Sequence, residues 1–507
     1  MVGPPGKEGA YRLIRAFHRH RGFAADQIDS FDRFVFDNIP EIIRENPTID
    51  VVADATGLRH TVRIHSITFD SPSVLESTGV RRYVTPTECL QRRMNYALHA
   101  KIRATYTVRT AGGKVKYLRE VYNHDFDQVP CLKMSRLCNT LRSGGGDLED
   151  EREAGGYFVL NGQERVLIGQ EQAVHNAPIV SLNDDGTAKL EIRSVRKLRS
   201  TSTLYMHFKP EYPTTQEDTR RCVAGAVTVH IPYIADKPDC AAVFRMLGVK
   251  TLEEMLDHVC ARDDPPWFVD RVKDVLSADP AAYLTTPDAL IAKLVKDRVS
   301  RSSSVDKEDP KRFRRSFDAL IRDSFLSQQG HTLADTPGKV VLFADTLRTL
   351  LRTVYFLRET DDRDDYVNRR VALSASLLTL PFKTAYSEWR SKLAGALKHC
   401  KTQKIEVIED LLVGGIGVPL IKACNTGNVT SGKKRTGASN TPAASSGVEK
   451  TGQQLARIGM SAFISHIQRL CNPVSGRAID ARLQDTSSIG VVDPHETPDT
   501  KECGLMR

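Results

Sequence analysis

The sequence predicts a mixed α+β protein with several domains, and three observations predict this class. At roughly 150 residues per domain, the 507 residues suffice for about three domains or for one large domain with an insertion. Residues 61–69 and 100–121 alternate apolar and polar side chains, as half-buried strands do. Residues 336–357 instead repeat apolar side chains at helical spacing.

The composition is that of a globular protein. Hydrophobic residues make up 40% and charged residues 27%, which excludes wholesale disorder and a fibrous repeat. No apolar run approaches the roughly 18 residues of a membrane span, and the first thirty residues lack the apolar stretch of a signal peptide. The ten cysteines form no CxxC pair, which predicts reduced thiols and no structural zinc. We therefore expect a soluble intracellular protein.

The charge balance favours a polyanionic partner without requiring one. The chain carries 72 Lys and Arg against 63 Asp and Glu, a net charge of +9. Many basic proteins bind no nucleic acid, so the motifs must decide.

The elements follow from local patterns, beginning with a helix near the N terminus. Asp29 and Ser30 are suited to cap a helix that buries Phe31 and its neighbours, and Pro40 should interrupt or kink that helix. The alternation in residues 61–69 and 100–121 predicts strands, with Gly112 and Gly113 as a turn in the second run.

A hairpin is predicted within GGYFVLNGQERVLIGQE, residues 155–171. Two β-prone runs flank Asn161-Gly162, a pair that readily adopts the positive φ angles of a tight turn. These residues could simply build a sheet, without any role of their own in function. The acidic stretch before them, residues 143–153, is expected to be a flexible loop.

Strands and then helices are expected in the middle of the chain. Residues 187–245 are β-rich and end in a helix, the period from about 250 to 335 is helical, and residues 301–315 are expected to be a solvated charged surface. Thr336-Pro337 should begin a long core helix. It is not expected to be a cofactor box.

Two charged segments follow. In DDRDDYVNRR, residues 361–370, arginines offset the acids, so an ion-pair network at a domain boundary is favoured over a metal cluster. Residues 425–452 are rich in small residues and carry a cationic excess, which fits either a nucleic-acid contact or a plain solvated loop.

Enzymatic motifs are missing from the sequence. It contains no GxxxxGK[ST], GxSxG or HExxH pattern and no GxGxxG in a strand-helix setting. His18 and His20 are expected to be a surface pair. Individual residues therefore predict only a basic multi-domain protein with a cationic loop.

Family resemblance carries the prediction further. GGYFVLNGQERVLIGQE resembles the signature of the second-largest, beta-like subunit of multisubunit DNA-directed RNA polymerases. Other segments resemble the same family and follow in its order: QIDSFDRFVFDNIPEII (27–43), Pro86-x-Glu88-x-x-x-Arg92-x-x-x-Tyr96, VPCLKMSRLC (129–138), EIRS (191–194), IPYI with FRMLG, DDRDDYVNRR, Thr426-Gly427-Asn428, ISHIQRLCNP (464–473), Arg482 and HETPDTKECGL (495–505). They are collinear and span nearly the whole chain.

The resemblance implies an architecture and a function. It implies a protrusion in residues 1–185 and 363–420, an inserted lobe in 186–362, and a fork region in 421–507. Such a chain lines the DNA cleft of a nucleotidyltransferase that performs template-dependent RNA synthesis in transcription. The implied partners are the DNA template and RNA, the largest subunit, a polypeptide supplying the C-terminal half of this subunit, and other polymerase subunits, with no membrane.

The resemblance also implies site residues. Lys433, Lys434 and Arg435 match a fork loop beside the separating DNA strands, and Arg469 and Arg482 match fork positions near template and hybrid. Arginine at such positions can grip phosphate bidentately.

The same resemblance implies that this chain contacts the incoming nucleotide and that another chain holds the catalytic metal. Glu496 matches the glutamate of the family's ETPEG turn near the incoming nucleotide. No catalytic residue and no metal ligand is expected on this chain, because the family's largest subunit holds the catalytic Mg²⁺.

Departures from the family pattern limit the prediction. Asp499-Thr500 replaces the Glu-Gly of ETPEG, and residues 486–489 replace an Asn-Thr-His-Trp run. This divergence favours a large DNA virus as the source. The family continues for as many residues again, which predicts a split gene or a fragment. The alternative function is a non-catalytic nucleic-acid-binding or assembly protein descended from that subunit.

Overall fold

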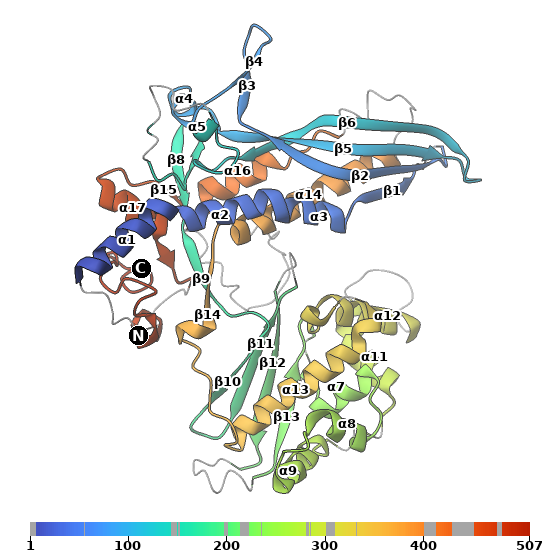
Figure 1. The fold of residues 1–507 in the computed structure, drawn as a ribbon. Helices are drawn as coiled ribbons and strands as arrows, with labels where there is room; N and C mark the ends of the chain where they lie inside the picture. The colour runs from blue at the N-terminus through green and yellow to red at the C-terminus, as the bar shows by residue number, and fades with distance from the viewer. Residues whose placement is uncertain are drawn as a thin grey trace. The chain divides into compact units, whose positions relative to one another are not determined.

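The chain forms two compact units, Met1–Gln172 with Arg370–Arg507 (unit 1) and Ala173–Arg369 (unit 2), each described by itself. The computed structural model describes the following residues: 7–54, 56–142, 150, 153–196, 201–212, 223–234, 236–279, 283, 285–300, 310–330, 332–399, 412–427, 451–473 and 479–507. Figure 1 labels their helices and strands. Residues 428–450 of the predicted cationic loop, with Lys433, Lys434 and Arg435, lie outside the described residues, whereas the two ends of the predicted segment belong to the helix Gly417–Thr426 and the strand Gly452–Gln454.

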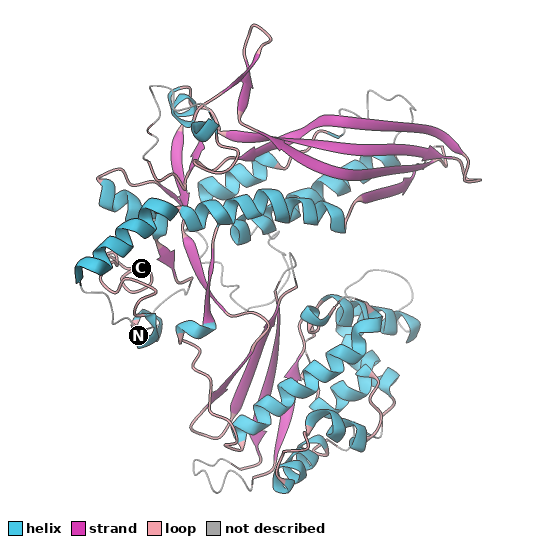
Figure 2. Ribbon diagram, in the orientation of Figure 1, coloured by secondary structure: helices cyan, strands magenta, loops and turns pink. Residues whose placement is uncertain are grey.

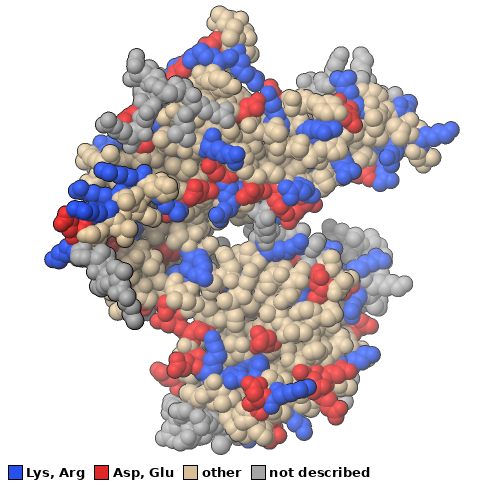
Figure 3. Space-filling model, in the orientation of Figure 1, with Lys and Arg blue, Asp and Glu red and all other residues tan. Residues whose placement is uncertain are grey.

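Unit 1 begins with a series of helices. They are α1 (Lys7–Arg21), α2 (Ala25–Arg33), the π-helical segment η1 (Phe34–Asn38) and α3 (Ile39–Glu45). The α1 helix buries none of its side chains, and Figure 3 shows lysine and arginine gathered over it. The predicted interruption at Pro40 is confirmed: the helix widens into η1 just before this residue, which has no N–H to donate.

The predicted helix cap is wrong. The α2 helix begins at Ala25, after Ala24, which makes no side-chain cap. Asp29 and Ser30 therefore lie inside the helix. The hydroxyl of Ser30 is used in tertiary structure, where it accepts a hydrogen bond of 2.9 Å from the Ala375 N–H.

An antiparallel sheet in the order β1-β2-β5-β6 forms the long arm of unit 1, as Figure 2 shows in magenta. The strands predicted from residues 61–69 and 100–121 are confirmed as β2 and the β5-β6 pair, which turns at Gly112-Gly113. The elements of this region are β1 (Thr48–Val52), β2 (Arg59–Asp70), β3 (Ser73–Leu75), β4 (Arg81–Tyr83), α4 (Pro86–Gln91), β5 (Ala97–Arg109), β6 (Val115–Pro130), α5 (Asn139–Arg142), α14 (Ser374–Lys398) and α16 (Gly417–Thr426). The α14 helix packs against β1 and α2.

The predicted hairpin is confirmed. Strand β7 (Phe158–Leu160) pairs antiparallel with β8 (Gln163–Leu167), and the turn residues Asn161 and Gly162 have φ angles of 52° and 72°. Two positive φ angles are what a two-residue type I′ turn requires.

Segments far apart in the sequence meet around this hairpin. Strand β15 (Gly452–Gln454) pairs with β8, and β9 (Gly169–Ala173) lies between β14 (Arg369–Ala372) and β16 (Leu470–Cys471). Parallel pairing joins β16 to β9. The hairpin region thus fixes the segment after residue 450 onto the first third of the chain.

Unit 2 is a four-stranded antiparallel sheet with helices packed on one of its faces. Its strands are β10 (Pro178–Leu182), β11 (Ala188–Ser194), β12 (Ser202–Pro210) and β13 (Gly225–His230). Its helices are α7 (Cys240–Leu247), α8 (Leu252–Val259), α9 (Pro266–Leu276), α11 (Pro287–Ser300), α12 (Pro310–Asp323), α13 (Thr336–Val354) and the 3-10 turns Ser327–Gln329, Leu333–Asp335 and Tyr366–Asn368. The predicted order of strands before helices is confirmed.

The long core helix predicted from Thr336-Pro337 is also confirmed, as α13. Its apolar stripe is buried, and the Phe343 ring lies 4.9 Å from Phe244 of α7. The stripe extends past the helix, because Leu357 follows the last helical residue, Val354.

Ion pairs form in the DDRDDYVNRR segment, as predicted. Asp361 pairs with Arg358 at 2.6 Å and accepts a bond of 2.9 Å from the Val180 N–H. Asp364 pairs with Arg369, the last residue of unit 2. These contacts close unit 2 where the chain returns to unit 1.

Among the helices that the structure describes, none combines the length and apolar character needed to cross a membrane.

Candidate functional site

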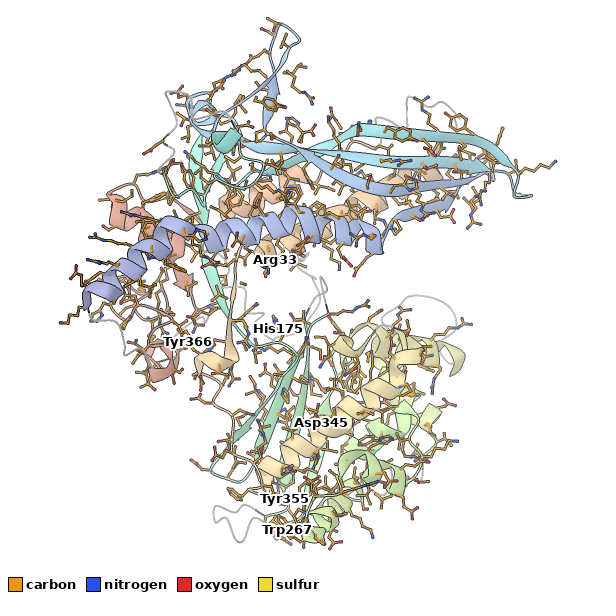
Figure 4. The ribbon with its side chains drawn as sticks, viewed as in Figure 1. Arg33, His175, Trp267, Asp345, Tyr355 and Tyr366 are labelled. Atoms are coloured by element: carbon orange, nitrogen blue, oxygen red, sulfur yellow. The ribbon has the colours of Figure 1, made fainter. Side chains whose placement is uncertain are left out.

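A cleft of about 1080 Å³ in unit 1 is the candidate site. Its walls come from α2, from the start of α14, from α17 (Met460–Gln468) and from the segment that follows residue 490. Figure 4 labels Arg33, which lines the cleft from α2. The cleft is lined by charges of both signs: Arg21, Arg33, Arg469, Arg507, Asp26, Asp29, Asp493 and Glu496.

Arg469 and Glu496, both predicted from sequence, meet in this cleft. The Arg469 Nη2 donates to Glu496 Oε1 at 3.2 Å and to Ser465 Oγ at 3.1 Å. Ser465 in turn donates to the same carboxylate oxygen at 2.7 Å. The Glu496 side chain is 50% exposed and that of Arg469 is 23% exposed, so the triangle faces the open side of the cleft.

Helix α17 positions two of these three residues. Ser465 and Arg469 are four residues apart and therefore share a face of the helix. On the opposite side Phe463, His466 and Ile467 are buried and hold the helix in place. Arg469 leaves the helical conformation, with φ −63° and ψ 137°, and the chain continues directly into β16.

His466 fixes the helix to the segment before it. Its Nδ1 accepts a hydrogen bond of 3.0 Å from the Ala456 N–H. The proton is therefore on Nε2, which lies 3.0 Å from Gln453 Oε1 and donates to it. Burial and, secondarily, the charge of Arg469 lower the pKa of His466 to about 4, so the ring is neutral at pH 7.

Arg482 lies on the 3-10 turn Asp480–Arg482 and folds the segment that carries Glu496. Its Nη1 donates to the carbonyls of Lys501 at 2.9 Å and Cys503 at 2.6 Å. Gly504, with φ +73°, packs so closely that a Cβ there would lie 2.6 Å from the Arg482 carbonyl oxygen. A second 3-10 turn, Thr486–Ser488, follows in the same segment.

An ionic cluster around Arg457, whose residues do not line the cleft, was not predicted from sequence. Arg457 pairs with Glu164 at 2.6 Å, pairs with Glu153, and donates to the Tyr157 hydroxyl at 2.9 Å. Lys133 pairs with Glu153 at 2.7 Å from the other side. The Arg457 guanidinium also stacks on aromatic rings, 4.7 Å from the Phe463 centroid and 5.2 Å from that of Tyr157.

Glu153 corrects the expectation of a flexible acidic loop through residue 153. Burial raises the pKa of this carboxyl, but Lys133 and Arg457 outweigh burial and leave the pKa below its ordinary value. The ion pair between Lys133 and Glu153 is enclosed, with 4% and 14% of the two side chains exposed, so Glu153 has a fixed position. No local pattern signals this role, because Glu153 and Arg457 are some 300 residues apart; only the acidic bias of the segment was visible.

Of the six predicted site residues, the structure describes Arg469, Glu496 and Arg482. Arg469 and Glu496 share the cleft, whereas Arg482 binds backbone carbonyls. No set of three or more His, Cys, Asp or Glu side chains suited to a metal ion occurs among the described residues.

Comparison with known proteins identifies the family. The RNA polymerase beta subunit family matches residues 22–416, and RNA polymerase Rpb2, domain 3, matches residues 453–507. Similar proteins include DNA-directed RNA polymerase II subunit RPB2 of Encephalitozoon cuniculi, 27% identical, and DNA-directed RNA polymerase II subunit 2 of Arabidopsis thaliana, 24% identical. Each alignment covers 99% of this chain and 43% of the relative.

A shorter relative is covered almost completely. DNA-directed RNA polymerase subunit Rpo2N of Methanothermobacter thermautotrophicus (strain Winter) is 23% identical over 99% of this chain and 94% of its own length. The two family matches lie in order along the chain and together include the hairpin, unit 2 and every cleft residue except Arg21. The chain belongs to the RNA polymerase beta subunit family.

Proposed function

We propose that this chain is the N-terminal part of the second-largest subunit of a DNA-directed RNA polymerase and lines the DNA cleft during template-dependent RNA synthesis. The observation that carries the proposal is the pair of ordered family matches, residues 22–416 and 453–507. The chain spans 43% of the RPB2 relative and 94% of the Rpo2N relative. The activity is therefore proposed for an assembly that includes this chain.

We assign nucleic-acid contacts to Lys433, Lys434, Arg435, Arg469 and Arg482. Arg469 supports the assignment physically. Its bonds to Ser465 and Glu496 both use Nη2, and a guanidinium has five N–H donors, so donors remain for a phosphate. Arg482 holds residues 501–503 through Nη1, and the other N–H donors of its guanidinium would serve the phosphate contact.

Glu496 is proposed to lie near the incoming nucleotide. Its carboxylate pairs with Arg469 through Nη2, and a phosphate of the incoming nucleotide would compete for that nitrogen. The pair would then act as a switch between an internal contact and a ligand contact. A carboxylate itself gains nothing from phosphate, so Glu496 should affect nucleotide addition more than DNA affinity.

Metal and partners complete the proposal. Mg²⁺ would be held by the largest subunit, where it supplies the two-metal chemistry of phosphoryl transfer. The other partners would be DNA and RNA, a polypeptide carrying the remaining half of the subunit, and further polymerase subunits, inside a cell or virion. We assign the inserted lobe to residues 186–362, within unit 2, the protrusion to 1–185 and 363–420, and the fork to 421–507. The viral source stays a prediction.

The experiment uses the reconstituted assembly with two variants. Glu496→Ala should slow single-nucleotide addition about tenfold while leaving the DNA dissociation constant within about twofold, which corresponds to a transition-state effect of about 1.4 kcal/mol. Asp493→Ala is the matched control, because Asp493 lines the same cleft three residues earlier. If both variants lost nucleotide addition equally, the effect would come from the net charge of the cleft and not from Glu496 in particular. No loss in either would leave Glu496 without a role in nucleotide addition.

A further inference from the structure

The sheet of unit 2 has one face that its helices do not cover. Side chains alternate between the two faces of a strand, and Leu190, Met206 and Val229 point into the helical core. Figure 1 shows α7, α8 and α13 gathered on one side of this sheet. The residues between the buried ones therefore lie on the opposite face.

Two of the cross-strand rows on this face carry its aromatic rings. The strand register places Glu191 opposite Tyr205 and Tyr205 opposite His230. The neighbouring row places Lys189 opposite His207. We call the four residues Lys189, Tyr205, His207 and His230 the open sheet face; each is partly exposed.

Three rings lie side by side on the open sheet face. The Tyr205 ring centroid is 6.0 Å from that of His230 and 6.4 Å from that of His207. Lys189 Nζ lies 4.5 Å from the Tyr205 centroid, in a cation–π contact. Aromatic rings on an open antiparallel sheet, interleaved with cations, are the arrangement on which proteins stack unpaired bases.

The charges around the rings favour a polyanion. Lys237 lies close enough to lower the pKa values of both His207 and His230, although burial is the larger cause in each case. Lys189 adds to this effect at His207. The acid in these rows, Glu191, is already bound to Arg193 at 2.6 Å, so its charge is compensated.

We propose that the open sheet face binds single-stranded nucleic acid, with bases stacking on Tyr205 and on the neighbouring histidine rings and with Lys189 contacting a phosphate. Each ring presents a π-face that tolerates any base, so the contact should be only weakly sequence-specific. The site shares no residue with the cleft of unit 1 and does not depend on the proposed function.

The test measures binding of a fluorescein-labelled 12-nucleotide oligouridylate to the full chain by anisotropy, over a range of salt concentrations. Tyr205→Ala should weaken binding at least roughly fivefold, the lower end of the effect of losing one stacking platform. Tyr205→Phe keeps the ring and should bind as the parent does. Both variants change the same residue, so comparing them separates the contribution of ring stacking to binding from that of the hydroxyl.

A charge variant tests the phosphate contact. Lys189→Ser should reduce the slope of log affinity against log salt by about 0.7, the value for one phosphate contact on a single strand. Lys273→Ser removes an exposed cation from α9, on the helical side of unit 2, and should leave the slope unchanged.

The proposal would be overturned if Tyr205→Ala bound the oligonucleotide as tightly as Tyr205→Phe does. It would also be overturned if a poly-glutamate peptide bound as tightly as the oligonucleotide and lost affinity in Lys189→Ser but not in Tyr205→Ala. That second result would assign the face to an acidic protein partner. Thermal melting of each variant checks that the sheet is intact. Failure of RNA synthesis in the assembly would not affect these measurements.

Discussion

His466 should make unit 1 lose stability as the pH falls from 7 to 5. The folded protein holds this ring neutral, with Nδ1 accepting from the Ala456 N–H and Nε2 donating to Gln453. Protonation would place a hydrogen on Nδ1, where it would face the Ala456 N–H, and the hydrogen bond between them would be lost. The folded state therefore resists a proton that the unfolded chain takes up readily.

The sign and size of this effect follow from the two pKa values. The folded pKa is about 4, and the unfolded value is about 6.5. Because the unfolded state binds the proton first, stability is lost as the pH falls below 6.5, and the loss is complete near pH 4. For these values the loss between pH 7 and pH 5 is about 2 kcal/mol.

The assay is urea unfolding at both pH values, compared between the parent and His466→Asn. Asparagine cannot titrate, and its side-chain oxygen can still accept from the Ala456 amide. The chain has 2 tryptophans, one in each unit. A Trp267→Phe background leaves Trp389, which is buried in unit 1, as the fluorescent reporter.

The parent should lose about 2 kcal/mol more than His466→Asn between pH 7 and pH 5. Other titrating groups are shared by the two proteins, so their contribution cancels in this difference. Equal losses in both proteins would refute the assignment of a neutral, hydrogen-bonded His466.

Three further predictions concern the hairpin, the ionic cluster and the cationic loop. Gly162→Val should destabilise unit 1 by more than about 1 kcal/mol, because φ is +72° and a Cβ would lie 2.8 Å from the Arg93 Cα; an unchanged urea midpoint would argue against the tight turn. Arg457→Ala should cost about 2 kcal/mol by leaving two enclosed carboxylates without their shared cation, and Arg457→Lys should recover only part of it because lysine cannot reproduce the fork and the stacking; equal stability of the two variants would contradict this. Replacing the three cations at 433–435 by serine should lower the salt slope for bubble DNA binding by up to about 3, whereas an identical slope would make the loop a plain solvated segment.

Sequence patterns correctly predicted the turn and the helix whose structures depend on residues close together in the chain. Asn161-Gly162 specifies its turn through backbone preference alone, and the repeat from Val340 onward specifies α13. The start of α2 was missed because Ala24 carries no capping side chain. Tertiary contacts hold this helix instead, including the bond of 3.1 Å from Gln27 to the Leu167 carbonyl.

The candidate site was predictable only in part, because several of its contacts join residues that are far apart in the sequence. Family resemblance selected Arg469 and Glu496, and the structure brings them within 3.2 Å. It also selected Arg482, whose guanidinium binds carbonyls of its own segment, a contact that depends on how residues 501–503 turn. The Arg457 cluster joins distant segments and has no periodicity or spacing that a sequence pattern could reveal.

The central claim is that this chain works inside an RNA-synthesising assembly. The most direct test is template-dependent nucleotide addition with Mg²⁺ by an assembly of the largest subunit, the polypeptide carrying the remaining half of this subunit, and the other polymerase subunits, measured with and without this chain. We expect elongation only when the chain is present, and none by the chain alone, because the Mg²⁺ of phosphoryl transfer is proposed to be held by the largest subunit. Equal elongation without the chain would show that the chain is not needed for RNA synthesis and would favour a non-catalytic nucleic-acid-binding or assembly protein.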